Sequence, residues 1–288
     1  MTGFSPSDVS AVVCTMNSIS GIERCLISLR EARVGELIVV DAHSSDGTRE
    51  VAQRLADRLL DDPGTGLGNA RNVGIAQTAK PLILNMGSDN VMPMGELEIM
   101  IAYLQGGGFQ GVSAQTAIEG GDYASRGLNA WRKGRFRPGP VAVIGTPTLL
   151  LGELLRKNPY DSNRRFSDDS ELCERWTSQL SARFAVSDAT VLEVGKTSLS
   201  EVIIRCKMYG ISDEEVFRHG RASGWGVRRQ ARSLLHPLIA DFVDPVTHLS
   251  PPEAITSAPF LAGFAVARYF YWGRCALKHS SNNRSGKS

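Results

Sequence analysis

The 288-residue sequence has few cysteines, little excess charge and no long apolar segment free of charges, and each shortage excludes a class of protein. Its five cysteines are odd in number, widely spaced and never arranged as paired ligands, so we predict neither a disulfide framework nor a zinc site. The N-terminus, MTGFSPSD, lacks a basic stretch followed by an apolar core, which argues against a secretory signal. These features indicate the reducing cytoplasm.

Charge is nearly balanced along the chain. Lys and Arg number 32 and Asp and Glu number 30, and the net charge of +2 is too small to favour nucleic acid as a partner. An apolar content of 42% and a charged content of 22% are typical of globular folds and do not indicate disorder or a fibrous repeat. A chain of this length can form one large domain, or one domain with a C-terminal appendage.

The N-terminal third alternates strand and helix patterns. Short β-branched apolar runs indicate strands covered on both faces, and apolar residues at helical spacing follow each run. The predicted strands are 9–15, 37–40 and 81–85, and the predicted helices are 18–30, 48–59 and 66–79. This alternation predicts an α/β fold with a Rossmann-like, mostly parallel sheet flanked by helices.

Three polar segments lie beside these predicted strands and helices, in the order ELIVVDAHSSDGT (36–48), GLGNARNVG (66–74) and LILNMGSDN (82–90). Each segment has side chains able to hold a base, a ribose, phosphates or a metal. Because the carboxyl ends of parallel strands meet at one edge of a sheet, we expect one nucleotide-sugar pocket there.

With these segments the chain resembles the family 2 inverting glycosyltransferases, and the resemblance extends from about Val9 to Arg175. The family's Thr-x-Asn step appears as Thr15-Met16-Asn17, and its strand ending in Asp before Ser-x-Asp-Gly-Thr appears as Asp41 and 45–48. Its Gly-x-x-x-Ala-Arg-Asn-x-Gly signature occupies 66–74. The resemblance implies a glycosyltransferase A type of mixed sheet and a nucleoside-diphosphate sugar as donor.

Candidate donor-binding residues follow from these motifs. A carboxylate at a strand end, such as Asp41, can accept a hydrogen bond from the base N3 or from a ribose hydroxyl, and otherwise serves as a turn residue. Asp46 fits either nucleotide contact or ordinary turn and capping chemistry. Arg71 fits contact with the base or diphosphate, or pairing with surface acids. The remaining donor candidates are Thr15, Asn17, Ser88 and Asp89.

The family's metal motif, Asp-x-Asp, aligns with Gly87-Ser88-Asp89, so the first acid is missing. The resemblance implies that Asp89 binds Mg²⁺ or Mn²⁺ together with diphosphate oxygens. The alternative is that 88–90 forms only a turn before Pro93.

The acceptor half begins near Val141 with a predicted strand at 143–151. The segment that follows resembles the family's Phe-x-Glu-Asp-x-Asp-Leu region, and its aligned acids are Asp168, Asp169 and Glu171. Inverting transfer needs one carboxylate to take the proton of the acceptor hydroxyl, and Asp169 is the candidate base. Acids at a helix start also act as caps favoured by the helix dipole.

A basic and aromatic segment at 126–137 (RGLNAWRKGRFR) is predicted to be a Gly-containing loop. It fits an acidic or phosphorylated acceptor, including a lipid diphosphate, with Trp131 stacking on a sugar and Arg132 and Asp168 beside it. The alternative is a solvated loop without a ligand.

We assign 1–195 to the catalytic domain, with a donor half at 1–92 and an acceptor half at 93–195, and 196–279 to a helical extension. His219 is either a surface residue or a phosphate or metal contact. The apolar segment 259–277 contains Arg268, which disfavours a transmembrane helix. We expect it to lie at the inner membrane surface with Tyr271 and Trp272 at the headgroups, or to dock on the core or on a second subunit. Residues 280–288 are predicted to be disordered.

The sequence therefore predicts a metal-assisted inverting glycosyltransferase of the cytoplasm, acting on a glycan, a lipid-linked glycan or another hydroxyl acceptor. A nucleotidyltransferase would carry a Gly-rich basic loop after the first strand, and Thr15-Met16-Asn17 is not such a loop. A dehydrogenase is disfavoured because 64–68 lacks the Gly-x-Gly-x-x-Gly spacing. A noncatalytic nucleotide-sugar or glycan binder remains an alternative because of Gly87.

Overall fold

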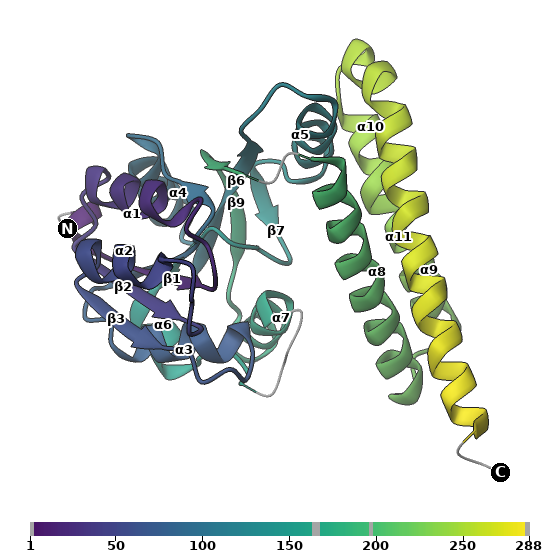
Figure 1. Cartoon of the computed structure of the whole chain (residues 1–288), viewed down its shortest axis with the longest axis horizontal. Coiled ribbons are helices and arrows are strands. Elements are labelled where there is room, and N and C mark those ends of the chain that lie inside the picture. Colours follow the sequence, from purple (N-terminus) through teal and green to yellow (C-terminus); the bar gives the residue numbers. More distant parts are fainter. Residues whose placement is uncertain (1–2, 163–167, 196–197, 286–288) are drawn as a thin grey trace. The chain divides into compact units, whose positions relative to one another are not determined.

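The computed structural model describes residues 3–162, 168–195 and 198–285 (Figure 1). The chain forms two compact units, one made of Met1–Glu119 with Arg137–Gly195 and the other of Gly120–Phe136 with Lys196–Ser288. The predicted domain boundary lies at 195. The structure in addition groups 120–136 with the C-terminal helices.

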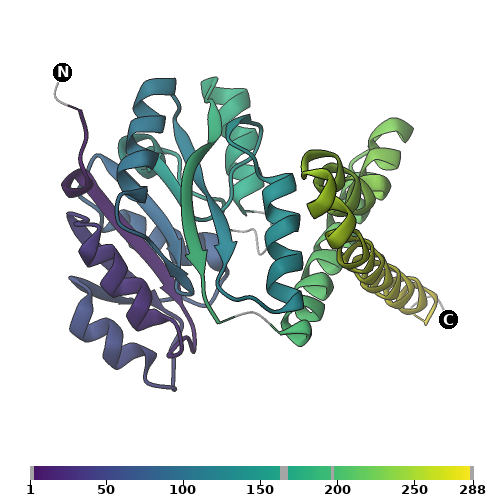
Figure 2. The same ribbon diagram turned by 90° about the horizontal axis from the view of Figure 1, so that it is seen from above.

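The first unit is built on one sheet flanked by helices (Figures 1 and 2). Its strands are β1 (Val9–Thr15), β2 (Glu36–Asp41), β3 (Arg58–Asp61), β4 (Leu82–Gly87), β5 (Asn90–Val91), β6 (Gly111–Ile118), β7 (Gly139–Val141), β8 (Thr148–Leu151) and β9 (Phe184–Glu193). Its helices are the 3₁₀ helix η1 (Pro6–Asp8) and α1 (Ile22–Glu31), α2 (Thr48–Leu55), α3 (Leu67–Ala76), α4 (Glu96–Gly107), α6 (Gly152–Lys157) and α7 (Asp168–Leu180).

The strand order is β3-β2-β1-β4-β8-β6-β9-β5, and β7 pairs with β9. Strands β3, β2, β1 and β4 are mutually parallel, and β6 is parallel to β9. Strand β8 runs antiparallel between β4 and β6, and β5 and β7 are antiparallel to β9. The predicted Rossmann-like, mixed and mostly parallel sheet is confirmed.

The first strands form where their sequences are apolar on both faces. In β1 every residue from Val9 to Val13 is buried, as expected for a central parallel strand. Helix α3 lies close against β1 and β2 because it carries Gly74, where a Cβ atom would come within 2.5 Å of Val12 and 3.0 Å of Val40. The last glycine of the Ala-Arg-Asn-x-Gly segment is therefore a packing requirement.

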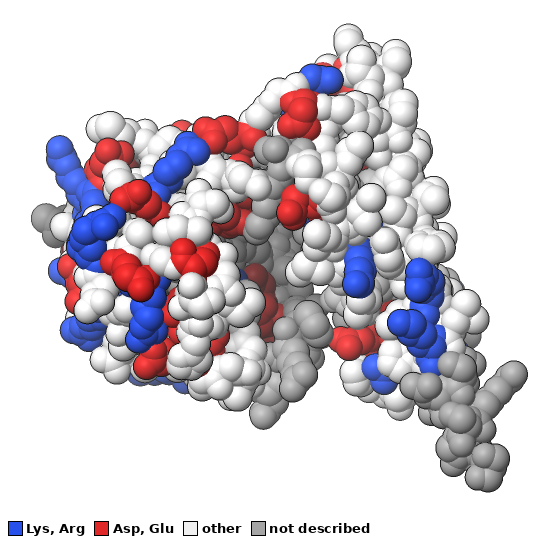
Figure 3. Space-filling view, viewed as in Figure 1, with Lys and Arg blue, Asp and Glu red and all other residues white. Residues whose placement is uncertain are grey.

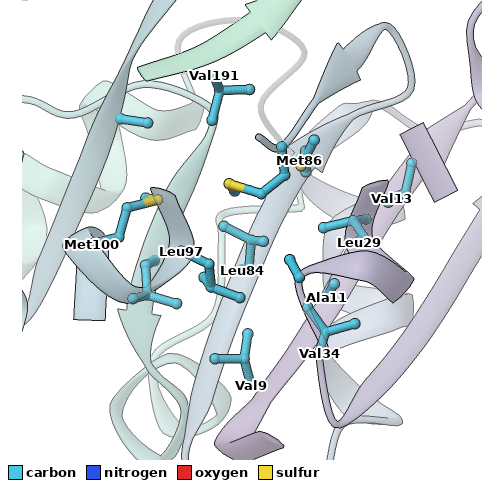
Figure 4. Close-up of a cluster of buried hydrophobic side chains, with 14 of the residues drawn as sticks. Val9, Ala11, Val13, Leu29, Val34, Leu84, Met86, Leu97, Met100 and Val191 are labelled. Atoms are coloured by element: carbon cyan, nitrogen blue, oxygen red, sulfur yellow. The ribbon is translucent and has the colours of Figure 1, made fainter. Parts of the chain in front are cut away.

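A hydrophobic core fills the space between the sheet and helices α1 and α4. Figure 4 shows side chains of β1, β4 and β9 meeting Leu29 of α1 and Leu97 and Met100 of α4. These residues are all buried. This core fixes the positions at which β1 and β4 end, and the candidate donor residues follow those ends.

Three local predictions differ from the structure. Leu59 lies in β3 and not in the preceding helix, because α2 ends at Leu55 and the chain enters an edge strand. Only Thr148–Leu151 of the predicted strand 143–151 is extended within the sheet. The predicted loop at 126–137 is wrong, since it lies largely in helix α5 (Tyr123–Arg135), which Asp122 caps by accepting hydrogen bonds from the backbone of Ala124 and Ser125.

The second unit is helical. It contains α5 together with α8 (Leu199–Ala222), α9 (Val227–Leu238), the π-helix η2 (Ile239–Val243), α10 (Asp244–His248) and α11 (Pro251–Ser285). Helix α11 packs on α8 at Gly210, where a Cβ atom would lie 2.5 Å from the backbone oxygen of Arg268. The helical extension predicted for the C-terminal third is thus present.

Arg268 lies inside this helical unit and is 4% exposed. Its guanidinium donates to Asp213 at 2.6 and 2.8 Å and to Asp241 at 2.8 and 3.0 Å. These two acids compensate the buried charge that disfavoured a membrane span in the sequence. Trp272 contacts Phe217 of α8 edge-on, with ring centroids 5.7 Å apart, so segment 259–277 docks on its own unit.

Among the described residues, no helix combines the length and apolar character needed to cross a membrane. Helix α11 continues to Ser285 and includes the first six residues of the predicted disordered tail. Residues 286–288 of that prediction lie outside the described residues.

Candidate functional site

The parallel register brings the predicted donor residues to one edge of the sheet. Thr15 of β1 is paired with Asp41 of β2, and Cys14 is paired with Gly87 of β4. The loops that follow β1, β2 and β4 therefore start side by side, as expected where α/β folds bind ligands.

The loops after β1 and β2 are joined through Asn17. This residue has a φ of 46°, a left-handed conformation that asparagine adopts more readily than most residues. Its backbone N–H donates to Ser44 Oγ at 2.8 Å, and its Oδ1 accepts from the Ser45 N–H at 3.0 Å. The Thr-x-Asn step thus holds the two donor-side loops in one arrangement.

Asp46 performs the turn role that was part of its alternative assignment. Its Oδ1 accepts from the Thr48 hydroxyl at 2.6 Å and from the Thr48 N–H at 3.1 Å. Its Oδ2 accepts from the Ile19 N–H at 3.1 Å. These hydrogen bonds lower the pKa of Asp46 because they favour its charged form. The hydrogen bond from the Thr48 hydroxyl has the largest effect. Nucleotide contact by Asp46 stays a prediction.

Asp41 is fully buried at the end of β2. Its carboxylate accepts from the Ser44 hydroxyl at 2.5 Å, from the Ser44 N–H at 3.0 Å and from Arg49 at 3.2 Å. Arg49 also pairs with Asp61 at 2.7 Å. The carboxylate therefore shapes the loop it precedes, and a base or ribose contact by Asp41 stays a prediction.

Two further donor candidates have polar groups at this edge. The hydroxyl of Thr15 is buried and has no hydrogen-bond partner in the described part of the chain. Such a group is costly to leave unpaired, so it suits a ligand that supplies the missing bond. Ser88 donates its hydroxyl to Ser18 at 3.0 Å and thereby joins the loop after β4 to the loop after β1.

The aligned metal motif has a compact geometry around Gly87. A Cβ atom at Gly87 would lie 2.8 Å from Asp89 Oδ1 and 2.9 Å from Asn90 Oδ1, so the side-chain oxygens of Asp89 and Asn90 occupy the space of a first acid. Asn90 Oδ1 accepts from the Gly87 N–H at 3.2 Å. A single protein carboxylate is consistent with a Mg²⁺ or Mn²⁺ site. Such ions retain several water ligands and are bound by one or two protein carboxylates together with substrate phosphates.

Arg71 of α3 is the centre of a buried polar cluster. Its Nη1 donates to Asp168 at 2.7 Å and to Asp169 at 2.9 Å, and its Nη2 donates to the Thr146 hydroxyl. Its guanidinium also lies over the Tyr160 ring, 5.1 Å from the centroid. Arg71 thus pairs with acids, as one alternative held, but these acids are half-buried and include the candidate base.

Burial and charge act against each other in this cluster. Burial raises the pKa of Asp169, Arg71 lowers it part of the way, and Asp168 raises it again, so that the pKa lies above its ordinary value. Burial alone would lower the pKa of Arg71, but Asp169, Tyr160 and Asp168 more than offset it, and the pKa is raised. A carboxylate with a raised pKa is suited to general base work.

Tyr160 is a site residue that sequence reasoning missed. Its hydroxyl donates to Asp169 at 3.3 Å and accepts from Asn85 Nδ2 at 3.2 Å. Its backbone is held by Asn72, whose amide donates to the Tyr160 carbonyl at 2.8 Å and accepts from its N–H at 3.0 Å. Asn72 belongs to the quoted signature, but no local pattern marked Tyr160 or Thr146.

Asp168 and Asp169 begin α7, as predicted for the acids of the acceptor half. The third acid, Glu171, pairs with Arg175 at 2.7 Å on the same helix. The preceding residues 163–167, which include part of the aligned Phe-x-Glu-Asp region, lie outside the described residues.

Trp131 and Arg132 are buried in the helical unit and are 2% and 6% exposed. The Trp131 N–H donates to Asp241 at 3.0 Å, and its ring contacts Phe264 with centroids 5.2 Å apart. A ring packed in this way is not available to stack on a sugar. The predicted acceptor loop at 126–137 is wrong because this segment forms most of the amphipathic helix α5, whose apolar face is buried.

The sequence model for "Glycosyl transferase family 2" matches residues 10–157 of the chain. The matched segment includes Asp41, Arg71 and Asp89 and ends before Asp169. No curated protein sequence matches the chain.

Several solved structures share the fold. The chain is 16% identical to S. aureus TarS, with a TM-score of 0.52, and covers 92% of its own length but only 54% of the TarS chain. It is 15% identical to TarS 1-349 in complex with UDP, with a TM-score of 0.51, and covers 95% of its own length and 91% of that chain. It is 13% identical to GalNAc-T7 with UDP, GalNAc and Mn²⁺, with a TM-score of 0.52, and covers 65% of its own length and 44% of that chain.

Proposed function

The chain belongs to glycosyl transferase family 2, and from this premise we propose that it transfers a sugar from a nucleoside-diphosphate sugar to a hydroxyl acceptor with inversion at the anomeric carbon. The observation that carries the proposal is the buried Arg71, which ties the helix of the donor signature to Asp169. TarS and GalNAc-T7, which share the fold, have been solved with UDP, and this supports a nucleotide-sugar donor.

In the proposed reaction Asp169 acts on the acceptor. Its carboxylate takes the proton of the acceptor hydroxyl while that oxygen attacks the anomeric carbon. The bond from this carbon to the diphosphate oxygen breaks on the opposite face, and the electron pair leaves with the nucleoside diphosphate. Tyr160 and Arg71 hold Asp169 Oδ1 at 3.3 and 2.9 Å and so fix the orientation of the base.

Asp89 is proposed to hold Mg²⁺ or Mn²⁺ together with the donor diphosphate. Such an ion neutralises the charge that develops on the leaving diphosphate. The buried hydroxyl of Thr15, which has no hydrogen-bond partner among the described residues, supports a contact with the donor at the same edge of the sheet. Ser88 holds the loop after β4 through its bond to Ser18, which positions Asp89.

The noncatalytic alternative rests on Gly87, which replaces the first metal-motif acid. A protein that only binds nucleotide-sugar could dispense with Asp169, which this chain retains and holds through Arg71 and Tyr160. Substitution of Asp169, described in the Discussion, separates these two functions.

The donor assignment is tested by replacing Asp89 with alanine. We expect metal-dependent binding of one donor among UDP-, GDP- and dTDP-sugars in the wild type, and a loss of about 10- to 100-fold in donor affinity in Asp89→Ala, because the ion loses its protein ligand. Calorimetry with Mg²⁺, Mn²⁺ or chelator measures the affinity.

Asp188→Ala is the matched control, because Asp188 is an exposed acid of β9 in the same unit. Donor binding that is equal in all three proteins, with and without metal, would overturn the role of Asp89. Failure of every nucleotide-sugar to bind the wild type would overturn the donor pocket itself.

A lipid-linked acceptor would require contact with a membrane surface, and we propose that α9 supplies it. The residues Val227, Ala231, Leu234, Leu235 and Leu238 follow i, i+4, i+7, i+8 and i+11 and share one face. This face is open to solvent, with Val227 82% and Leu235 48% exposed. An exposed apolar helix face of this kind is typical of interfacial helices.

The charges beside this face are complementary to anionic lipid. Arg228, Arg229 and Arg232 of α9 are exposed, and the first turn of the helix holds no acid. On the face of the helical unit that Figure 3 shows, Lys and Arg side chains gather toward one end, and much of the rest of that face is uncharged. Each cation near an anionic surface contributes about 1 kcal/mol of binding free energy.

Sedimentation with lipid vesicles tests this contact. We expect the full chain to bind vesicles of phosphatidylcholine mixed equally with phosphatidylglycerol, and to bind those of phosphatidylcholine alone much less. The double variant Val227→Gln/Leu235→Gln should bind about tenfold less, because two apolar side chains no longer enter the interface. Met94→Gln, which changes a 79% exposed side chain in the other unit, is the control. Vesicle binding that depends neither on the anionic lipid nor on the two substitutions in α9 would contradict the proposal.

A further inference from the structure

Helices α8 and α11 bring three different metal-ligand side chains together in the helical unit, and the proposed transferase site uses none of them. Glu214 comes from α8, and Cys275 and His279 come from successive turns of α11. Spacing of i and i+4 puts the cysteine and histidine on one face of the helix. The sequence predicted no zinc site because no second cysteine lies near Cys275. The third ligand is 61 residues away.

The separations between the three ligand atoms match a single tetrahedral ion. Cys275 Sγ lies 3.6 Å from Glu214 Oε2 and 3.7 Å from His279 Nδ1, and these last two atoms are 3.5 Å apart. Zinc bonds of about 2.3 Å to sulfur and about 2.0–2.2 Å to nitrogen and oxygen at tetrahedral angles place ligand atoms roughly 3.4–3.6 Å apart. One ion can therefore reach all three atoms with small shifts.

The carboxylate of Glu214 has a further reason to bind a cation. The residue is 4% exposed. Among the described residues its Oε2 accepts a hydrogen bond from the Cys275 thiol at 3.6 Å, and the nitrogens of His279 and Arg218 lie 3.5 Å from its two oxygens, longer than the about 2.7–3.2 Å of a typical N–H···O hydrogen bond. Oε2 is directed at Cys275 and His279, whereas Oε1 is directed at Arg218. Its two nitrogen contacts are longer than typical hydrogen bonds, and an ion between the three ligands would compensate the buried charge more closely.

We propose that Glu214, Cys275 and His279 bind one Zn²⁺ that links α11 to α8, with water as the fourth ligand. The set of sulfur, nitrogen and oxygen donors suits Zn²⁺, which is borderline soft. On binding, the Cys275 thiol releases one proton to water. His279 moves its ring proton from Nδ1, which without the ion donates to the Cys275 carbonyl at 3.1 Å, to Nε2, so that the Nδ1 lone pair can bind the ion. One thiolate and one carboxylate balance the charge of the ion, so the site becomes neutral.

Competition between the full-length protein and a chromophoric chelator for Zn²⁺, under reducing conditions, tests the site. Each of Glu214→Gln, Cys275→Ser and His279→Gln is expected to weaken Zn²⁺ binding by at least about 100-fold, since even outer-shell changes weaken metal sites about 10- to 100-fold. With Co²⁺ in place of zinc, the wild type should show a thiolate charge-transfer band that Cys275→Ser lacks.

His219→Gln is the matched control. His219 is an exposed residue of α8, and its Nδ1 lies 3.0 Å from the Glu215 backbone oxygen. This variant should bind Zn²⁺ as the wild type does. Glu214→Gln removes a buried charge without changing the shape of the side chain, so circular dichroism should show it folded.

Two results would overturn the site: a wild type that binds Zn²⁺ no more tightly than Cys275→Ser, or tight binding that all three substitutions leave unchanged. The measurement needs neither donor nor acceptor, so its outcome is independent of the proposed transferase function.

Discussion

Asp169→Asn is expected to lower kcat by about 10²- to 10⁴-fold while leaving donor affinity unchanged. The amide keeps the size and the contacts of the side chain but cannot take the proton of the acceptor hydroxyl. In the wild type, burial keeps the pKa of Asp169 above its ordinary value, and a base is active when it is deprotonated. The rate should therefore fall with decreasing pH in a range above that of an ordinary carboxylate, and this dependence should be absent from the variant.

Glu171→Gln is the matched control for this measurement, because Glu171 lies on the same helix turn and pairs with Arg175. We expect it to change kcat less than severalfold. Loss of turnover in Glu171→Gln with full activity in Asp169→Asn would assign the role of general base to Glu171 in place of Asp169. Equal donor binding and no turnover in any protein, wild type included, would favour the noncatalytic alternative.

Arg71→Met is expected to destabilise the first unit by about 3–5 kcal/mol, the usual cost of leaving buried charges without their partner. The side chains of Arg71, Asp168 and Asp169 are 7%, 13% and 23% exposed, so water screens the network little. Urea unfolding followed by circular dichroism gives the loss in the free energy of unfolding. Hydrogen exchange of β1 and β4 peptides assigns it to the first unit.

Two further variants separate charge compensation from simple loss of packing. Arg24→Met removes an exposed pair with Glu119, whose side chains are 51% and 48% exposed, and should cost no more than about 1 kcal/mol. Adding Asp168→Asn and Asp169→Asn to Arg71→Met should restore most of the lost stability, because the uncompensated carboxylates are then neutral. A triple variant as unstable as Arg71→Met would contradict this explanation.

Local patterns in the sequence predicted the donor half well. The run at 9–15 matches β1, and the predicted strands at 37–40 and 81–85 lie at β2 and β4, because a strand buried on both faces is mostly apolar. Ser10 of β1 and Asn85 of β4 are the buried polar exceptions. The polar residues Thr15 and Asp41 end β1 and β2. Asn17 and Asp46 could thus be placed on the two loops, although only the structure showed how these loops hold each other.

The acceptor half was harder to predict because its strands pair out of sequence order. Strand β8 lies between β4 and β6, and no turn or period in the sequence encodes that position. Helix α5 was mistaken for a basic loop because the apolar residues that cover its inner face, such as Phe260 and Phe264, come from α11. A helix that is basic on one side is distinguished from a loop only by such a partner.

The sequence by itself determined the family, the first strands of the sheet and the acids that begin α7, because each of these depends on residues close together in the chain. The tertiary structure alone decided that Arg71 pairs with Asp168 and Asp169, that Arg268 pairs with Asp213 and Asp241, and that Glu214 meets Cys275 and His279. These charged groups become partners only when the packing of helices and strands excludes water around them. That packing is a property of the whole chain and not of any segment.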